Sequence, residues 1–240
     1  QDLRAEPVRD GKTATADTLD PADMTLAELR RHLAPLIANA AVFDGWSEEA
    51  LEMAADQAGV DRDVARLAFK GKSGLSQMAM IEAWIATIDR EMADKMTPEK
   101  LGAMKVRERI RSLVQFRLDA VRGQEEALRR ATAIMAMPQN AAASLKTGWS
   151  SADLMWRLAG DTATDWNHYT KRTILAGIYG ATLAVFVSDE SEDKQETRAF
   201  LDRRIDGVMK FEKAKAQLLG RERESFSMMR FLGRLRYPVK

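Results

Sequence analysis

The 240-residue sequence predicts an all-α fold, and three observations support this prediction. Apolar residues recur at helical spacing from Met24 onward, and no stretch keeps a sustained two-residue alternation. Glycine, proline and capping residues divide the periodic segments. With 45% hydrophobic and 30% charged residues, the chain has the composition of a globular protein that buries a core.

The apolar period predicts ten helices in chain order, each bounded to within about three residues. They lie at residues 26–41, 48–58, 62–69, 75–96, 98–122, 125–137, 141–159, 166–188, 191–219 and 222–237. Thr97 before Pro98 marks a helix start, and Gly59, Gly123 and Gly160 suit left-handed C-caps. Connections are short, so we expect one compact domain.

Four regions follow from this pattern. Residues 1–23 are expected to be a disordered tail, because charges of both signs alternate there without the apolar region of a signal peptide. Residues 24–73 are expected to form a three-helix segment of helix-turn-helix type, residues 74–219 a helical bundle with candidate lipid-binding and dimer-interface positions, and residues 220–240 an amphipathic helix. The longest uncharged run, residues 173–187, is too short for the roughly 20 apolar residues of a spanning helix.

Residues 54–69 have the pattern of a helix-turn-helix with Gly59 in the turn. Between Asp44 and Asp63 there are seven acidic residues and only Arg62 as a base, a local charge of −6. A surface that binds phosphates would be basic, so we expect no nucleic acid partner. A ligand-responsive regulator of the tetracycline-repressor type stays open as the alternative, and it predicts salt-sensitive duplex binding by residues 44–73.

The chain has few residues of the types that catalyse reactions or bind metal ions. The chain has no cysteine, which excludes disulfides, thiolate metal sites and cysteine catalysis. Gly71-Lys72-Ser73 lacks the glycine of a phosphate loop, because Arg66 stands at that position. Only His32 and His168 are present, too few for a carboxylate-bridged di-iron set. We therefore expect no catalysis, metal or cofactor, although an unrelated helical enzyme with a buried acid/base pair remains a second alternative.

The helix at 166–188 is apolar and rich in small residues in its second half. This pattern predicts a helix buried in the core, and the small residues also allow close approach of a second backbone. Candidate dimer-interface residues are Gly177, Gly180 and Ala184. The two interpretations are compatible.

The last predicted helix is amphipathic. Met228, Phe231, Leu232 and Leu235 fall on one stripe, while Arg230 and Arg234 fall on the opposite side with Arg223. Residues 221–240 carry a net charge of +4, which attracts anionic lipid. The segment is expected either to bind a membrane surface or to pack on its own domain.

Methionine and tryptophan are frequent on the middle helices, with 13 and 5 residues in the chain. Methionine adapts to irregular cavities, so these stripes either line a lipid site or form plain core. The candidate lipid-binding residues are Trp149, Met155, Trp156, Ile178 and Tyr179.

Three blocks resemble the accessory proteins of ubiquinone biosynthesis that bind lipid and assist the demethoxyubiquinone hydroxylase. They are Phe-Asp-Gly-Trp-Ser at 43–47, Lys-Val-Arg-Glu-Arg-Ile-Arg at 105–111, and the long run at 159–172, with similar stretches through 175–179, 189–191 and 200–205. The resemblance extends from about residue 33 to 212.

The resemblance implies a tetracycline-repressor-like helical bundle that no longer binds DNA, a homodimer, and a pocket for an isoprenoid quinone intermediate or a phospholipid. It further implies a peripheral protein that presents its lipid to the hydroxylase, at the cytoplasmic face of a bacterial inner membrane or the matrix face of a mitochondrial one. The hydroxylase contact would involve Asp165, Asn167, His168, Tyr169 and Arg172. His168 departs from the family, which usually carries tryptophan or another aromatic there.

Overall fold

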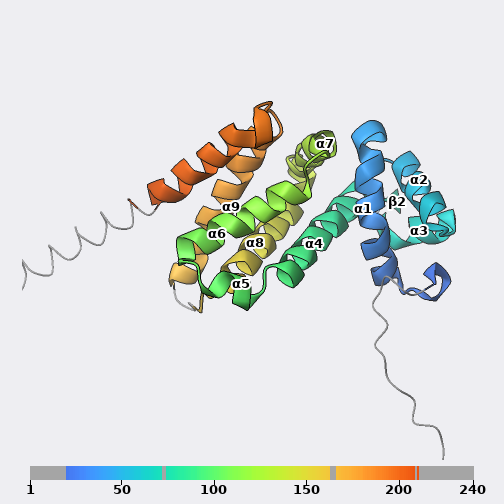
Figure 1. Cartoon of the computed structure of the whole chain (residues 1–240). Helices are drawn as coiled ribbons and strands as arrows, with labels where there is room; N and C mark the ends of the chain where they lie inside the picture. Colours follow the sequence, from blue (N-terminus) through green and yellow to red (C-terminus); the bar gives the residue numbers. More distant parts are fainter. Residues whose placement is uncertain (1–19, 72–73, 163–165, 209, 211–240) are drawn as a thin grey trace, which may run out of the picture.

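The computed structural model of the chain describes residues 20–71, 74–162, 166–208 and 210, without the side chains of Trp166 and Asn167. Its fold is all-α, as the apolar period predicts (Figure 1). The elements are η2 (Pro21–Asp23), α1 (Leu26–Asp44), α2 (Glu48–Ala58), α3 (Arg62–Ala68), β1 (Lys70–Gly71), β2 (Gly74–Leu75), α4 (Gln77–Lys95), α5 (Pro98–Gly102), α6 (Val106–Ala120), α7 (Glu125–Met135), η3 (Pro138–Asn140), α8 (Ala141–Leu158), α9 (Trp166–Phe186) and η4 (Glu192–Lys194). Residues 195–208 form a further helix.

Helices α1, α2 and α3 form a head at one end of the molecule, and α4 leads from it into the bundle (Figure 1). Thr25 and Glu28 form a capping box at the start of α1, in which the Thr25 hydroxyl accepts the Glu28 N–H. Gly59 ends α2 with φ +67°, a left-handed conformation that favours glycine. Gly160 also has positive φ and directly follows Ala159, the C-cap of α8, as predicted. Gly123 has positive φ as well, but the C-cap of α6 is Val121, two residues earlier.

Buried aromatic residues join the head to the bundle. Trp46, just after α1, is fully buried, and its indole N–H donates to the Ala127 carbonyl of α7 over 2.9 Å. Its ring centroid lies 5.3 Å from that of Trp84 on α4. Helix α1 packs against α2, α4 and α7, so the head and the bundle share one hydrophobic core.

The bundle consists of α4 to α9 and the helix at 195–208 (Figure 1). Helix α8 packs against α9, and α4 packs against α6, α7 and α8. Its core contains Met80 and Ile88 of α4, Leu113 of α6 and Leu175 of α9. None of the helices in the described ranges has both the length and the apolarity needed to cross a bilayer.

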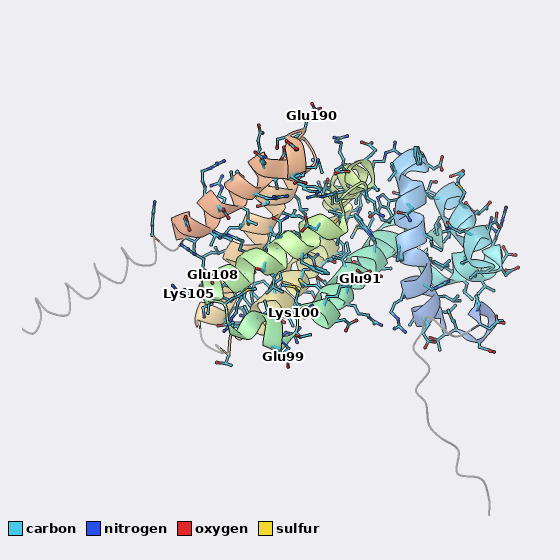
Figure 2. All side chains as sticks on the ribbon, viewed as in Figure 1. Glu91, Glu99, Lys100, Lys105, Glu108 and Glu190 are labelled. Atoms are coloured by element: carbon cyan, nitrogen blue, oxygen red, sulfur yellow. The ribbon has the colours of Figure 1, made fainter. Side chains whose placement is uncertain are left out.

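The predicted helix at 98–122 is wrong in one respect, because it is two helices, α5 and α6, with a break between them. The Arg109 guanidinium donates to the carbonyls of Gly102, Met104 and Ala159 over 3.2, 2.9 and 3.0 Å. The bonds to Gly102 and Met104 satisfy backbone acceptors that the break leaves without helical partners, and the bond to Ala159 satisfies one at the end of α8. Lys105 and Glu108, labelled in Figure 2, lie at the start of α6, where the Lys105 N–H donates to the Glu108 carboxylate.

Two further segments differ from the sequence prediction. The loop expected at residues 70–74 contains the short antiparallel hairpin of β1 and β2. The helix expected from residue 191 begins with the turn η4 and becomes α-helical at residue 195. The buried Asp189 carboxylate organises this start, because it accepts hydrogen bonds from the N–H and hydroxyl groups of Ser191 and Thr197. The predicted disordered tail at residues 1–23 is wrong at its end, because residues 21–23 form η2 with Asp20 as its N-cap. Residues 1–19 of that tail and the predicted amphipathic helix at residues 220–240 lie outside the described residues.

Candidate functional site

Three rings from α8 and α9 form a cluster, here called the aromatic patch, made of Trp149, His168 and Tyr169. The centroid of Trp149 lies 6.4 Å from that of His168 and 5.9 Å from that of Tyr169, and the last two are 5.2 Å apart. Tyr169 is 58% exposed. Aromatic residues that combine a large apolar surface with exposure are typical of protein interfaces. The patch therefore suits contact with another protein.

The side chain of Arg172, another predicted hydroxylase contact, is buried beside the aromatic patch. It is 2% exposed, and its Nε and Nη1 contact Asp153 and Asp161 at 2.6 and 3.1 Å. Nη1 also donates to the His168 carbonyl over 3.0 Å. A buried guanidinium needs such partners, because an isolated charge in the interior is costly. From its buried position Arg172 thus links the first turn of α9 to α8 through His168 and Asp153.

Asp161 is the second anchor of this turn. Burial of Asp161 opposes ionisation, but hydrogen bonds and charges from Lys171 and Arg172 outweigh it and lower the pKa of its carboxyl below the ordinary value. Lys171 Nζ lies 2.6 Å from the carboxylate. Sequence reasoning missed Asp153, Asp161 and Lys171 as supports, because ion pairs across 10 or more residues have no local sequence signal.

An open groove of about 520 Å³ lies beside the patch, lined by all three of its rings and by Arg157 and Thr162. Asp165 lies outside the described residues, and the side chain of Asn167 is not described. Of the five predicted hydroxylase contacts, the structure therefore brings His168, Tyr169 and Arg172 to the walls of the groove, although Arg172 is 2% exposed.

A cavity of about 220 Å³, here called the apolar cavity, lies between α6, α8, α9 and the helix at 195–208. Its lining consists of Val106, Arg107, Ile110, Trp156, Thr170, Lys171, Ile174, Leu175, Ile178, Ile205 and Val208. Most of these side chains are apolar, so the cavity suits an apolar group. The Trp156 ring is fixed because its indole N–H donates to the Lys171 carbonyl over 3.0 Å.

The five predicted lipid-binding residues do not line one cavity. Trp156 and Ile178 line the apolar cavity, whereas Trp149 belongs to the aromatic patch. Met155 is fully buried in the core, and Tyr179 lines a second cavity on another face of α9. The apolar spacing of α8 and α9 could not separate these faces, since each helix presents apolar residues to more than one neighbour.

The composition of α9 predicted a helix buried in the core, but one side of this helix is exposed. Gly177, Gly180 and Ala184 are exposed along one stripe of the helix. A Cβ atom added at either glycine would meet nothing within 4 Å. In the single chain this stripe is free, and its role as a dimer interface stays a prediction.

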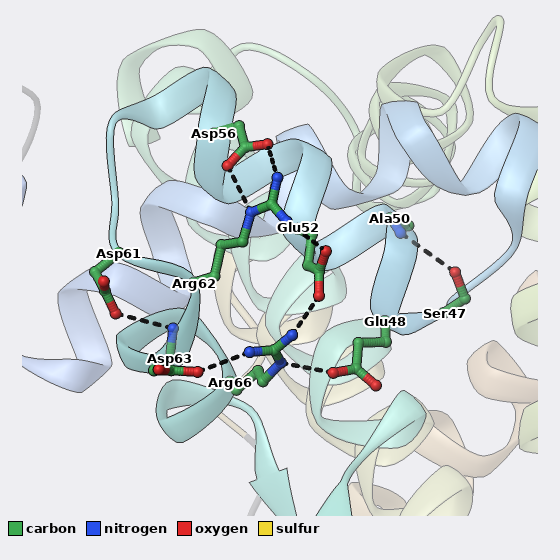
Figure 3. A network of polar contacts seen from close by, with 9 residues as sticks. All are labelled: Ser47, Glu48, Ala50, Glu52, Asp56, Asp61, Arg62, Asp63 and Arg66. Atoms are coloured by element: carbon green, nitrogen blue, oxygen red, sulfur yellow. Dashed lines mark hydrogen bonds and ion pairs between the residues drawn. The ribbon is translucent and has the colours of Figure 1, made fainter.

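The basic side chains of α3 are engaged within the head (Figure 3). Arg62 forms ion pairs with Asp56 at 2.6 Å and Glu52 at 2.9 Å. Arg66 contacts Glu48 at 2.6 Å, Asp63 at 2.7 Å and also Glu52. These partners compensate the two guanidinium charges that a DNA-binding helix would offer to phosphates.

Comparisons with known proteins agree with the resemblance in the sequence. The family model for COQ9 matches residues 141–212, which include α8, α9, the helix at 195–208 and the aromatic patch. The chain is 33% identical over 168 residues to the rat protein named "Ubiquinone biosynthesis protein COQ9, mitochondrial", covering 69% of this chain and 54% of that protein. The human protein of that name is 32% identical over 168 residues, with 69% and 52% coverage. The chain spans about half the length of these curated relatives.

A solved structure shares the fold. The chain superposes on a TetR transcriptional regulator from Nitrosomonas europaea with a TM-score of 0.59 and 22% identity, covering 74% of this chain and 96% of the regulator. At this identity the likeness shows the fold alone. Residues 141–212 thus form a COQ9 family region, and the chain is a homologue of the COQ9 proteins with a TetR-like all-α fold.

Proposed function

We propose that the chain is a non-catalytic, lipid-binding accessory protein of ubiquinone biosynthesis. It binds an apolar quinone intermediate at the membrane and presents the head group to the demethoxyubiquinone hydroxylase. The observation that carries this proposal is the apolar cavity, whose α8 and α9 walls lie in the region that matches COQ9. Burial of apolar surface there is worth about 25 cal/mol per Å², so a prenyl chain gains from leaving water.

The volume of the apolar cavity limits what it holds. About 220 Å³ is less than the roughly 300–1,000 Å³ of common ligand clefts, so it shelters a few isoprene units or a segment of acyl chain. The rest of the lipid would stay in the bilayer or against the terminal segment. This suits a presenting protein better than a carrier that encloses its cargo.

Helix α9 links the cavity to the aromatic patch. His168 and Tyr169 belong to the patch, while Lys171 and Ile174 line the cavity, so the two sites lie within two helical turns. A hydroxylase docked on the patch would therefore lie beside the bound lipid. In this proposal His168 replaces a larger aromatic anchor and weakens that contact.

The remaining parts of the proposal concern assembly and location. A homodimer would form through the exposed stripe of Gly177, Gly180 and Ala184. The basic segment at residues 221–240 would bind anionic lipid with Met228, Phe231, Leu232 and Leu235, which lie outside the described residues. The relatives are named mitochondrial. The chain would be peripheral at the matrix face of that inner membrane, or at the cytoplasmic face in a bacterium.

A non-catalytic role agrees with the side chains present. Within the described ranges no group of three or more histidine, aspartate or glutamate side chains could hold a metal ion. Asp161 and Asp189, whose carboxyl pKa values are lowered by hydrogen bonds, accept structural hydrogen bonds near helix starts. In this proposal the hydroxylase supplies the chemistry, and loss of the chain slows hydroxylation.

Lipid co-purification tests the proposal. Native mass spectrometry after gentle extraction should detect an isoprenoid or phospholipid on the wild-type chain. Ile174→Trp, which fills the apolar cavity, should remove most of it, whereas Leu145→Trp at a position 75% exposed should retain it. A wild-type chain that is persistently empty and ignores liposomes would refute lipid binding.

A ligand-responsive transcriptional regulator is the second candidate, and the TetR-like fold favours it. The ion pairs of Arg62 and Arg66 oppose it, because phosphates would have to displace several carboxylates. Gel-shift assays with genomic fragments distinguish the two. Nanomolar, sequence-dependent and salt-sensitive binding would favour the regulator.

A further inference from the structure

The helix at residues 195–208, here called the covering helix and drawn in orange-red in Figure 1, forms one wall of the apolar cavity. Its inward residues recur at helical spacing, and Thr197, Leu201 and Ile205 are buried. Ile205 and Val208, near its end, line the cavity together with residues of α6, α8 and α9. The first turns of the covering helix therefore pack on the core, whereas its last turn lies over the cavity.

Buried polar contacts fix the start of the covering helix. The Asp189 carboxylate, which is 4% exposed, accepts hydrogen bonds from the N–H and hydroxyl groups of Ser191 and Thr197. Lys194 Nζ donates to the Asp189 carbonyl over 2.7 Å and lies 3.3 Å from the Glu125 carboxylate of α7. Lys194 also has φ +57°, a conformation that a non-glycine residue keeps only where surrounding contacts hold it. This end moves only if several contacts break together.

Exposed ion pairs hold the other end of the covering helix against α6. Arg107 Nη1 lies 3.0 Å from Asp206 Oδ1, and Arg111 Nε lies 2.6 Å from Asp202 Oδ1. The spacing of the two pairs shows that the helices run antiparallel. The side chains of Arg107 and Asp206 are 44% and 45% exposed. Exposed ion pairs are weak and screened by salt, so this end is held less firmly than the start.

The apolar packing under this end is also incomplete. A space of about 220 Å³ separates Ile205 and Val208 from Ile110 and Ile174 on the other walls. Atoms that face a void lose the dispersion contacts that close packing supplies. Outward movement of this end therefore costs less than movement of the start. It would also enlarge the cavity toward the roughly 300–1,000 Å³ of common ligand clefts.

The surface around this end is rich in basic residues. Residues 105–111 contain four basic residues and one acidic residue, and Arg203 and Arg204 are exposed on the covering helix. A guanidinium binds a phosphate through two parallel hydrogen bonds, as it binds a carboxylate. An anionic bilayer attracts Arg107 and repels Asp206, so lipid phosphates compete directly with this ion pair.

We propose that an anionic bilayer surface opens the apolar cavity, because lipid phosphates displace Asp206 from Arg107 and the covering helix turns outward about its fixed start. An apolar chain then enters between α6 and the covering helix. Away from the bilayer the ion pair forms again and the helix closes over the bound chain. The inference rests on the proposed lipid binding, and it adds how the lipid enters and what controls its entry.

Distance measurements by pulsed electron paramagnetic resonance test this movement on the full chain. The sequence has no cysteine, so spin labels attach only at introduced cysteines. Asp94→Cys on α4 is the reference, Arg203→Cys reports the end of the covering helix and Glu196→Cys reports its start; all three positions are exposed. Vesicles of phosphatidylglycerol and phosphatidylcholine should lengthen the distance from 94 to 203 and leave that from 94 to 196 unchanged. Vesicles of phosphatidylcholine alone should change neither distance.

A double variant separates competition for Arg107 from membrane binding itself. Arg107→Leu with Asp206→Leu replaces the ion pair by an apolar contact that phosphate does not displace. This variant should still float with anionic vesicles but keep the short distance from 94 to 203. Because both side chains are about half exposed, the double variant should retain the fold, and circular dichroism checks this.

A single variant tests the same ion pair without vesicles. Arg107→Gln breaks the pair and should accelerate transfer of bound phospholipid to cyclodextrin about two- to fivefold, the factor that an exposed ion pair supplies. Arg122→Gln is the matched control, because Arg122 forms a similarly exposed pair with Asp193 at the fixed start of the covering helix. It should leave the transfer rate unchanged.

The outcomes separate this inference from the proposed function. An unchanged distance from 94 to 203 on anionic vesicles, or equal lengthening in the double variant, would overturn the inference. Lipid that still co-purifies with the wild type would then retain the proposed function. Movement of the covering helix in a chain that never carries lipid would support the opening and refute the proposed lipid site.

Discussion

Replacing Arg172 tests whether the start of α9 depends on a buried ion network. Arg172→Met keeps the apolar stem but leaves Asp161, which is 6% exposed, and Asp153, which is 23% exposed, without their shared cation. Breaking a buried pair from one side costs about 3–5 kcal/mol. Because Asp153 is partly hydrated and Lys171 still faces Asp161, we expect a loss of about 3 kcal/mol.

Lys171→Ala is the matched comparison. Lys171 contacts the same carboxylate, but its side chain is 39% exposed and solvent screens the interaction. We expect a loss below about 1 kcal/mol. Urea unfolding followed by circular dichroism measures both free energies, and Arg172→Met should also lower Tm by roughly 6–12 °C.

The pH dependence gives an independent check. The pKa of Asp161 is lowered in the folded state, so its contribution is fully present above the unfolded value of about 4 and is lost as pH falls through the folded value. The stability difference between the wild type and Arg172→Met should therefore shrink below about pH 4. A loss under about 1 kcal/mol at pH 7, or equal losses for the two variants, would refute the reasoning.

Other expectations follow from the same structure. Burial of Asp189 opposes ionisation, but hydrogen bonds from Ser191 and Thr197 outweigh it and lower the pKa of its carboxyl. Asp189→Asn should therefore lower the free energy of unfolding at pH 7 and reduce the decrease of that free energy below about pH 4. An unchanged pH dependence of the free energy of unfolding would contradict this. Tyr169→Ala should weaken hydroxylase binding at least tenfold in pull-down or calorimetry without changing Tm, and an unaltered affinity would remove the patch from the interface. Gly177→Trp should yield monomers in sedimentation analysis with an intact fold, and a persistent dimer would exclude that stripe. Deletion of residues 221–240 should abolish liposome flotation but preserve the dimer; equal flotation would assign that segment to packing.

Much of the local structure was predictable because its determinants are near in sequence. The helix at 48–58 was predicted with the observed bounds, since Ser47 caps its start and Gly59 ends it. The break between α5 and α6 was not predicted. One of the three carbonyls that Arg109 binds near this break, that of Ala159, lies 50 residues away in the sequence.

The same distinction applies to the candidate site. Tyr169 and His168 were identified from a run of neighbouring residues, but their contact with Trp149 depends on α8 lying beside α9. Arg172 was predicted to contact the hydroxylase, and its burial was not foreseen although it lies three residues before the buried Leu175, on the same face of α9. The burial of Arg117 was not predicted, because the sequence pattern of an arginine among apolar residues is the same whether the side chain is exposed or buried in an ion pair.

The sequence by itself determined the all-α class, most helix bounds, the acidic head and the relationship to COQ9, because these depend on periodicity, capping and local blocks. Only the tertiary structure decided which apolar stripes meet, where the two cavities lie, and that Arg117 and Arg172 are buried. Helical spacing defines the faces of one helix but carries no information about its neighbour. Cavities and ion pairs arise between helices, so they follow from packing.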